Sequence, residues 1–190
     1  MSEGLSIDVR DTTRELIVEL GAIEEGITKK ASVRAVNRAL DRMNTAAGRE
    51  VRKVYNIKLR AIKDATKIRR ASVANKRAWG KLTFSGRPIP LIEFDARWTP
   101  NMAGASVKIL VGKGRVIRPG SFIATTKRGI TGVFQRKGKE RYPIKNLRSI
   151  SIPVAVTKQA VLDALTLIGF KSYRDEFLRQ VDLLVKKQNG

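Results

Sequence analysis

The sequence predicts an α+β fold: a long N-terminal amphipathic helix, a central antiparallel β-sheet or small barrel-like domain, and C-terminal helices. Apolar residues recur at helical spacing over residues 28–55, short β-rich runs broken by Gly and Pro fill 78–153, and helical spacing returns after residue 157. Helices, then strands, then helices are the order of an α+β arrangement. With 190 residues, 42% of them hydrophobic, the chain is long enough to bury a core.

Residues 1–27 form an acidic N-terminal segment. Apolar side chains alternate over residues 5–9, which predicts a short strand. Asp11 or Thr12 is placed to cap a helix after it. Gly26 is expected to end that helix.

The clearest signal is a long amphipathic helix from Thr28 to about Tyr55. Its apolar side chains recur at steps of three and four residues and form one stripe: Val33, Val36, Leu40, Met43, Ala47, Val51 and Val54. Basic residues gather on the opposite side. At 1.5 Å per residue the helix would be roughly 40 Å long, against a radius of gyration of about 16 Å for such a chain. We therefore expect it to span the domain or project from it.

A basic stretch follows at residues 56–77. It holds eight Lys and Arg against a single acid, Asp64, and its apolar residues are too sparse for a buried element. We expect a short helix near residues 58–65 and then an exposed basic arm. An ordinary charge run is a solvated face, but this excess of cations fits contact with a polyanion or a partner equally well.

Residues 78–156 predict an antiparallel β core. The expected elements are β-rich runs at 79–84 and 89–94, a hairpin over 106–117 around the turn 112–114, a second pair over 121–125 and 130–135 around the turn 127–129, and a strand near 142–144 after a turn at 137–139. The aromatic residues Trp79, Phe84, Phe94 and Trp98 are expected in the core rather than stacked on nucleic-acid bases.

Residues 157–190 predict C-terminal helices. Thr157 can cap the first helix, Gly169 is expected to stop it, and Ser172 to cap the last one. The chain thus divides into four segments, 1–27, 28–77, 78–156 and 157–190. We interpret them as one structural domain with an extended arm.

The chain contains no His and no Cys. This excludes an imidazole base, a thiolate, a disulfide, a zinc or haem site and a Ser-His-Asp triad, so no cofactor is expected and catalysis would have to use carboxylates, Lys, Ser or Tyr. Glu93 and Asp95, two apart on an expected strand, could hold Mg²⁺, but no third acid lies near them and salt bridges to nearby cations are the better interpretation. No apolar run approaches the roughly 18 residues of a membrane span, so no membrane contact is expected.

Lys and Arg outnumber Asp and Glu by 39 to 17, a formal net charge of +22. Residues 31–90 hold sixteen basic and three acidic residues and 91–150 thirteen and three, whereas 1–30 hold four and seven. Such a field attracts a polyanion, nucleic acid first and an acidic protein assembly second. The chain has no motif of the kinds that recognise a DNA or RNA base sequence, so we expect any contact with nucleic acid to be with phosphates. The candidates for contact with DNA or a partner are Arg49, Arg52, Lys53, Lys58, Arg60, Lys63, Lys67, Arg69, Arg70, Lys127, Arg128, Lys137, Lys139 and Arg141.

A resemblance to a known family rests on residues 119–154. The motifs that carry it are, in order, PGSFIA (119–124), GVFQR (132–136), RYPI (141–144) and IPV (152–154). Their order and spacing resemble the minor tail protein Z family of tailed bacteriophages and prophages. The long helix, the basic stretch, the IPLI run at 89–92 and the helical C-terminus agree, so the resemblance covers about residues 30–187. The chain departs from the family in its acidic N-terminal segment and in lacking the long Arg run of some members.

The resemblance implies a structural protein of the virion rather than an enzyme. It implies an α+β domain that assembles as a ring, commonly sixfold, at the head-proximal end of a phage tail after assembly in the host cytoplasm. The implied partners are further copies of the chain (a hexamer), the tail terminator, tail tube and head–tail connector proteins, and genomic DNA in the lumen. Six copies would carry six times +22, or +132, which DNA and acidic faces of adjoining rings would have to offset.

The alternative left open by the charge pattern is a sequence-nonspecific nucleic-acid-binding protein outside a virion, with the same basic arm on RNA or DNA. Rings or density at the tail end would favour the tail protein. A monomer with salt-sensitive affinity for any duplex would favour the free binder. A metal-dependent nuclease built on Glu93 is a more distant alternative.

Overall fold

The computed structural model describes four stretches of the chain, residues 4–10, 25–75, 77–100 and 104–189. The chain forms two compact units. The first, which we call the helical unit, comprises Gly4–Ala47, Thr66–Ser85 and Thr157–Gly190. The second, which we call the β unit, contains Gly48–Ala65 and Gly86–Val156. The α+β class expected from the sequence is confirmed by the presence of two long helices and three small antiparallel sheets.

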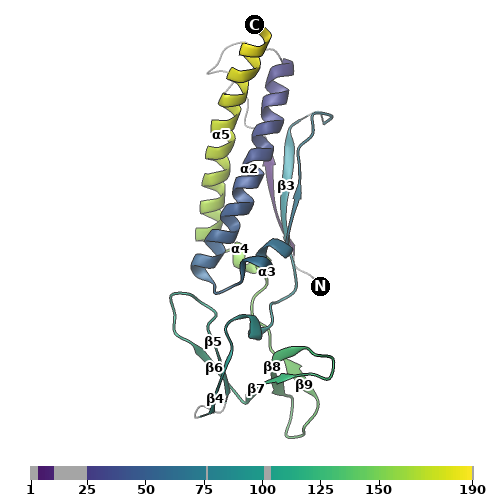
Figure 1. Ribbon diagram of the computed structural model, residues 1–190, viewed down its shortest axis with the longest axis vertical. Coiled ribbons are helices and arrows are strands. Elements are labelled where there is room, and N and C mark those ends of the chain that lie inside the picture. Colours follow the sequence, from purple (N-terminus) through teal and green to yellow (C-terminus); the bar gives the residue numbers. More distant parts are fainter. Residues whose placement is uncertain (1–3, 11–24, 76, 101–103, 190) are drawn as a thin grey trace. The chain divides into compact units, whose positions relative to one another are not determined.

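The helical unit consists of two long helices and one sheet (Figure 1). Helix α2 spans Glu25–Val54, with its last seven residues in the β unit, and α5 spans Gln159–Asn189. Figure 1 draws the two helices side by side, with the sheet next to α2. The sheet is antiparallel in the order β1-β3-β2, with β1 at Gly4–Arg10, β3 at Trp79–Ser85 and β2 at Thr66–Arg69.

Apolar side chains from both helices and from β3 form the core of the helical unit. Leu40 of α2, Leu82 and Phe84 of β3, and Leu165 and Phe177 of α5 are completely buried. Six of the seven residues of the predicted α2 stripe are buried, and Val54 is half-buried. The long amphipathic helix is therefore confirmed, because a period of 3.6 residues places that stripe on one side.

The prediction that Gly169 stops a helix is wrong, because this residue lies within the continuous helix α5. A Cβ atom at this position would lie 2.6 Å from the Met43 sulfur. The glycine therefore permits close packing of α5 on α2, which costs some helix propensity but brings the two backbones together. Ser172 likewise lies inside α5 rather than capping a last helix.

The prediction of an exposed basic arm after residue 65 is wrong for residues 66–69. Thr66–Arg69 is strand β2, which pairs with β3 in the register Arg69 to Lys81. Asn37 of α2 then holds the chain after the strand, because its side chain accepts a hydrogen bond from the Ala71 amide at 2.8 Å. This stretch is thus part of a folded sheet.

The β unit holds two three-stranded antiparallel sheets and short helices. Its strands are β4 (Arg97–Thr99), β5 (Gly104–Val107) and β6 (Val116–Pro119) in one sheet, and β7 (Ser121–Thr125), β8 (Thr131–Arg136) and β9 (Ile144–Asn146) in the other. Its helices are α3 (Leu59–Asp64), the 3₁₀ helix η1 (Leu91–Glu93) and α4 (Ile152–Val156), and it includes the last turns of α2. The two predicted hairpins correspond to β5–β6 and β7–β8 and are confirmed.

The strand predicted over residues 89–94 is wrong, since this run forms the 3₁₀ helix η1 after a single β-bridge at Pro90. Pro88, just before this run, and Pro90, within it, lack the amide donor that a strand ladder needs. Phe84 and Phe94 are buried as expected, but Trp98 is 51% exposed. The expected helix after Asp11 lies outside the described residues, and Gly26 lies in the first turn of α2 instead of ending a helix.

Candidate nucleic-acid and partner interface

All fourteen candidate cations are exposed, and they are divided between the two units. Three of them, Lys67, Arg69 and Arg70, belong to the helical unit, and the other eleven belong to the β unit. Twelve of them lie in helices, in strand β2 or in the turns that join paired strands, while Lys58 directly precedes α3 and Arg70 directly follows β2. That these cations form one charged face, as we expect from the sequence, stays a prediction.

The cations at the end of α2 are partly neutralised by one acid. Glu50 is 9% exposed, and its carboxylate lies 2.8 Å from Arg49 Nε and 2.7 Å from Lys53 Nζ. Arg52, on the same turn, forms no ion pair with a described residue. Arg52 is therefore the cation of this turn most available to an anionic partner.

The cations of α3 and the residue before it also differ in their partners. Lys58 Nζ lies 2.9 Å from a Glu93 carboxylate oxygen, and Arg60 Nε lies 3.7 Å from that of Asp64. Lys63, at the end of α3, has no ion pair within the described part of the chain. Because exposed pairs of this kind contribute little energy, Lys58 and Arg60 can exchange their acids for another anion.

In the helical unit, Arg70 and Arg69 have partners within the fold. Arg70 donates two hydrogen bonds to the Asp41 carboxylate, at 2.8 and 3.2 Å, which raises the pKa of the guanidinium. The Arg69 guanidinium lies 4.7 Å from the centroid of the Trp79 ring. Lys67 has no acidic partner among the described residues. Arg70 is therefore better explained by packing of β2 on α2 than by a ligand.

The second sheet of the β unit carries the remaining candidates in its two turns. Lys127 and Arg128 lie between β7 and β8, and Lys137, Lys139 and Arg141 lie between β8 and β9. These five side chains form no ion pair with any described residue, although the Arg141 guanidinium lies 5.9 Å from the Tyr142 ring centroid. Both turns therefore present charge that no acid in the described part of the chain neutralises.

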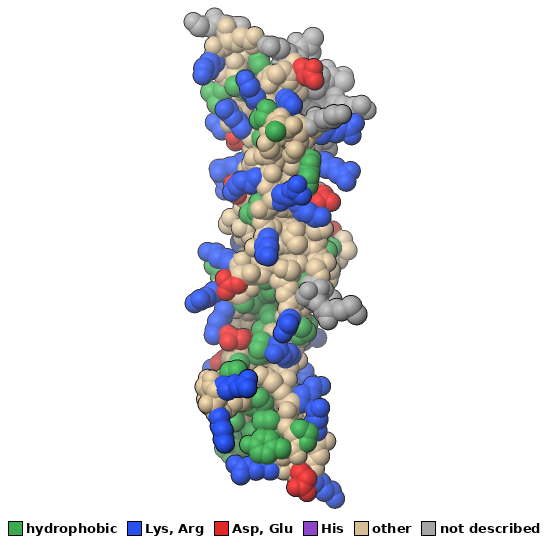
Figure 2. Space-filling model, turned by 90° about the vertical axis from the view of Figure 1, so that its right-hand side faces the viewer, with side chains coloured by type: hydrophobic (Ala, Val, Ile, Leu, Met, Phe, Trp, Pro, Cys, Tyr) green, Lys and Arg blue, Asp and Glu red, His purple; other side chains and the backbone are tan. Residues whose placement is uncertain are grey.

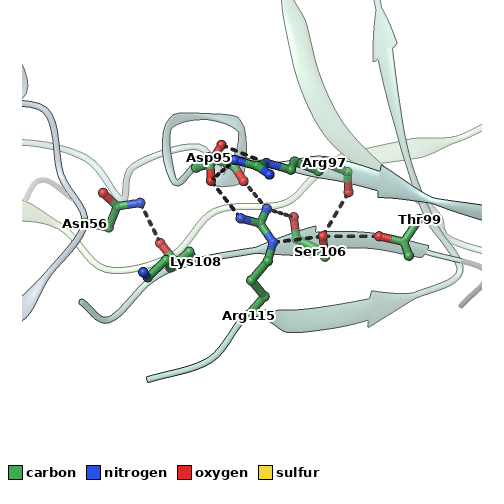
Figure 3. A network of polar contacts seen from close by, with 7 residues as sticks. All are labelled: Asn56, Asp95, Arg97, Thr99, Ser106, Lys108 and Arg115. Carbon is green, nitrogen blue, oxygen red and sulfur yellow. Dashed lines mark hydrogen bonds and ion pairs between the residues drawn. The ribbon is translucent and has the colours of Figure 1, made fainter. Parts of the chain in front are cut away.

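Both acids that could have held Mg²⁺ form ion pairs, Glu93 with Lys58 and Asp95 with two arginines, and Figure 3 shows the contacts of Asp95. Asp95 has a positive φ of 50°, and its carboxylate accepts hydrogen bonds from Arg115 Nη1 at 2.7 Å and Arg97 Nη2 at 3.1 Å. Arg115, and then Arg97, lower the pKa of that carboxyl. Arg115 also donates to the Ser106 carbonyl and hydroxyl oxygens, at 3.0 and 3.1 Å. The salt bridges that we expected are confirmed, and this network holds β4–β5 to the chain after η1.

Within the described stretches, no group of three acids, His or Cys is placed to hold a metal ion. In the same stretches, no helix is long and apolar enough to cross a bilayer. The features that stand out are exposed cations on small folded units, and Figure 2 shows Lys and Arg predominating over Asp and Glu on the face that it draws. This arrangement fits a basic protein that binds or assembles with other macromolecules.

The comparison with known proteins gives the family. Residues 13–182 match the family described as prophage minor tail protein Z (GPZ), and this match covers most of the chain. The chain belongs to this family of bacteriophage minor tail proteins, so the resemblance inferred from its motifs is confirmed. The tail completion protein of Escherichia phage N15 is 29% identical over 147 residues, which are 74% of this chain and 76% of that protein. No solved structure matches the chain.

The ion pairs of Glu50 make the stability of the β unit dependent on pH. The Lys53 ammonium, hydrogen-bonded to Glu50, lowers the pKa of that carboxyl, while burial acts in the opposite direction and Arg49 adds to the lowering. Because the folded pKa lies below the unfolded one, the stabilisation is complete above the unfolded pKa. It is lost as the pH falls through the folded pKa.

We therefore expect Glu50→Gln to lower the free energy of unfolding at pH 7 by about 1–2 kcal/mol, and to have little effect at a pH low enough to protonate Glu50 in the folded chain. Urea unfolding of both proteins at the two pH values measures this difference. Glu140→Gln is the control, because Glu140 is exposed and has no ion pair with a described residue. An equal loss of stability at both pH values would contradict the stabilising role of the Glu50 ion pairs.

Proposed function

We propose that this minor tail protein completes the head-proximal end of the tail, where copies of the chain form a ring, join the tail to the head connector, and contact DNA phosphates without sequence preference. The observation that carries the proposal is the set of candidate cations that have neither an acidic partner nor an aromatic ring contact among the described residues. They are Arg52, Lys63, Lys67, Lys127, Arg128, Lys137 and Lys139. In a phage tail protein, the polyanions at hand are DNA and acidic faces of other tail proteins.

The charge balance of the β unit supports this proposal. Residues 86–156 hold fourteen Lys and Arg against three Asp and Glu. Several copies in a ring would repel one another, because uncompensated like charge disfavours close packing. Assembly therefore requires an anionic partner, and phosphates in the lumen together with acidic adjoining rings would supply it. These seven candidate cations can contact such a partner without breaking an ion pair to a described residue.

The proposal predicts that infectivity depends on the two basic turns of the second sheet. A variant with Lys127→Gln, Arg128→Gln, Lys137→Gln and Lys139→Gln removes four charges from exposed turns, so the fold should persist. When this variant is supplied to a phage that lacks the protein, we expect a titre of infectious particles about 100-fold lower than with the native protein. The reason is that phosphate contacts add up strongly at physiological salt. Plaque counts and negative-stain images of head–tail joints measure the effect.

The matched control removes the same number of charges elsewhere, with Lys113→Gln, Lys158→Gln, Lys171→Gln and Lys187→Gln. These lysines are exposed and form no ion pair with a described residue. Equal titres for the control and the turn variant would contradict a role of the turns. Joined particles that lose their DNA would support the DNA contact, whereas tails that fail to join heads would support a protein contact.

A further inference from the structure

The sheet of the helical unit has one buried and one exposed face. Leu82 and Phe84 of β3 are buried on the inner face, and a Cβ atom at Gly80, on the same face, would lie 2.5 Å from Leu40 Cδ1. Side chains alternate along a strand, so the odd-numbered residues of β3 and β2 point outward. The outer face includes Arg10, Lys67, Arg69, Trp79 and Lys81.

Cations from all three strands meet on this outer face. The register places Arg69 of β2 and Asp8 of β1 on either side of Lys81 in β3, and Arg10 opposite Trp79. Like charges directly across two strands destabilise a sheet. The Arg69–Lys81 pair has one nearby acid, since Lys81 Nζ lies 3.8 Å from an Asp8 carboxylate oxygen. The sheet thus maintains an unfavourable pairing that an external anion would relieve.

Trp79 lies beside these cations and is half-buried rather than in the core. The Arg69 guanidinium covers its ring at 4.7 Å from the centroid. A pocket of about 430 Å³ opens next to it and is lined by Asp8, Arg10, Arg77, Ala78, Trp79 and Lys81. Figure 2 views the molecule from the β3 side and shows Lys and Arg side chains predominating on that face.

From this arrangement we propose a nucleic-acid site on the basic sheet face, defined as Arg10, Lys67, Arg69, Arg77, Trp79 and Lys81. The cations bind the phosphates of a DNA strand, and the Trp79 pocket receives a base or sugar from the same strand. The site deepens the proposed DNA contact and rests on it, but it places the contact on the helical unit. Three of its cations, Arg10, Arg77 and Lys81, were not among the candidates from the sequence.

The chemistry of this face favours nucleic acid over an acidic protein. Cations in a row with an aromatic ring between them match a strand that alternates phosphates and planar bases. An acidic protein surface would gain from apolar side chains around the cations, because interface cores are depleted of charge. On the basic sheet face, Trp79 is the large apolar side chain among the described residues of the three strands.

The test uses the full chain and fluorescently labelled oligonucleotides, one single-stranded and one duplex, with affinity measured by anisotropy over a range of salt. The sheet variant carries Lys67→Gln, Arg69→Gln and Lys81→Gln. The matched control carries Lys158→Gln, Lys171→Gln and Lys187→Gln, three exposed lysines of the same unit without ion pairs to described residues. Circular dichroism confirms that both variants fold.

We expect the sheet variant to bind DNA roughly 100-fold more weakly than the control at 0.1 M salt. The slope of log K against log salt should become less steep by about 2.7 for the duplex and about 2.1 for the single strand, since each lost phosphate contact removes about 0.9 or 0.7. Trp79→Leu should weaken binding of the single strand by about tenfold and leave the duplex nearly unchanged, because only unpaired bases can stack on the ring.

Two results would overturn the site. If the sheet variant and the control bind DNA equally well while the native chain binds strongly, the DNA contact stands but lies elsewhere. If DNA affinity is unchanged and the sheet variant fails to join tails, the basic sheet face binds an acidic protein. Absence of DNA binding by the native chain would instead contradict the proposed function itself, and the site with it.

Discussion

Gly80→Val is expected to destabilise the helical unit by about 3 kcal/mol, because the inner face of β3 has no room for a side chain. A Cβ atom at Gly80 would lie 2.5 Å from Leu40 Cδ1, 3.0 Å from the Arg69 carbonyl oxygen and 3.2 Å from Val36 Cγ1. The Leu40 methyl group can rotate away, but the Arg69 carbonyl belongs to the backbone of the paired strand. Thermal unfolding followed by circular dichroism measures the loss.

Gly4→Val is the control for this prediction, since Gly4 lies in β1 of the same sheet and a Cβ atom there would meet nothing within 4 Å. We expect its unfolding temperature to stay close to that of the native chain. Gly80→Val should also weaken DNA binding, because Trp79 and Lys81 flank the glycine. A stable Gly80→Val variant would show that the sheet can move away from α2, which the packing does not allow.

Gly104→Ala is expected to destabilise the β unit by a similar amount, about 3 kcal/mol. The added Cβ atom would collide with the Arg118 carbonyl oxygen and lie 2.9 Å from its carbon and 3.2 Å from the Pro119 Cα. All three atoms belong to the backbone of β6, so no side chain can rotate to make room. Strand β5 would have to separate from β6, with which it pairs from Gly104 to Val107.

The matched control is Gly114→Ala, in the loop that joins the same two strands, where a Cβ atom would meet nothing within 4 Å. Urea unfolding of the two variants gives the comparison. We expect the control to unfold within about 0.5 kcal/mol of the native chain, as exposed substitutions usually do. An equal effect of both substitutions would contradict the close approach of β5 and β6.

The parts of the fold that the sequence predicts are those with a strong local pattern. The apolar stripe of α2 follows from its period alone, and the hairpins β5–β6 and β7–β8 follow from turn residues between short β-rich runs. Strand β2 was missed because it has four residues, and its partner β3 begins ten residues later. Its two outward cations therefore looked like part of an exposed arm.

Glycines were the least predictable residues, because the same residue type ends helices and permits close packing. Gly169 had the sequence context of a helix stop, yet it lies against Met43 inside α5. The contact joins residues that are far apart in the chain, and no local pattern reports it. Only the packing of α5 on α2 distinguishes the two roles of glycine.

The sequence predicts which cations of the candidate site are exposed, but not how they are arranged or which acids they contact. The cations expected to contact an anion are all exposed, but their partners, such as Asp41 for Arg70 and Glu93 for Lys58, come from distant parts of the sequence. Conversely, Arg10 and Lys81 were not among the candidates, because about seventy residues separate them in the chain and only the sheet places them on one face. The alternation of side chains along each strand was the sequence pattern that could have indicated that both residues point outward.

The strand order of the helical unit has one more consequence. Among the described strands, β1 and β2 lie at the two edges of a three-stranded sheet, and an edge strand can pair with a strand of another chain. Charged side chains on an edge strand discourage such pairing, and β2 carries Lys67 and Arg69. The same cations would therefore disfavour pairing between free copies, and in the ring that we propose a polyanion would offset their charge.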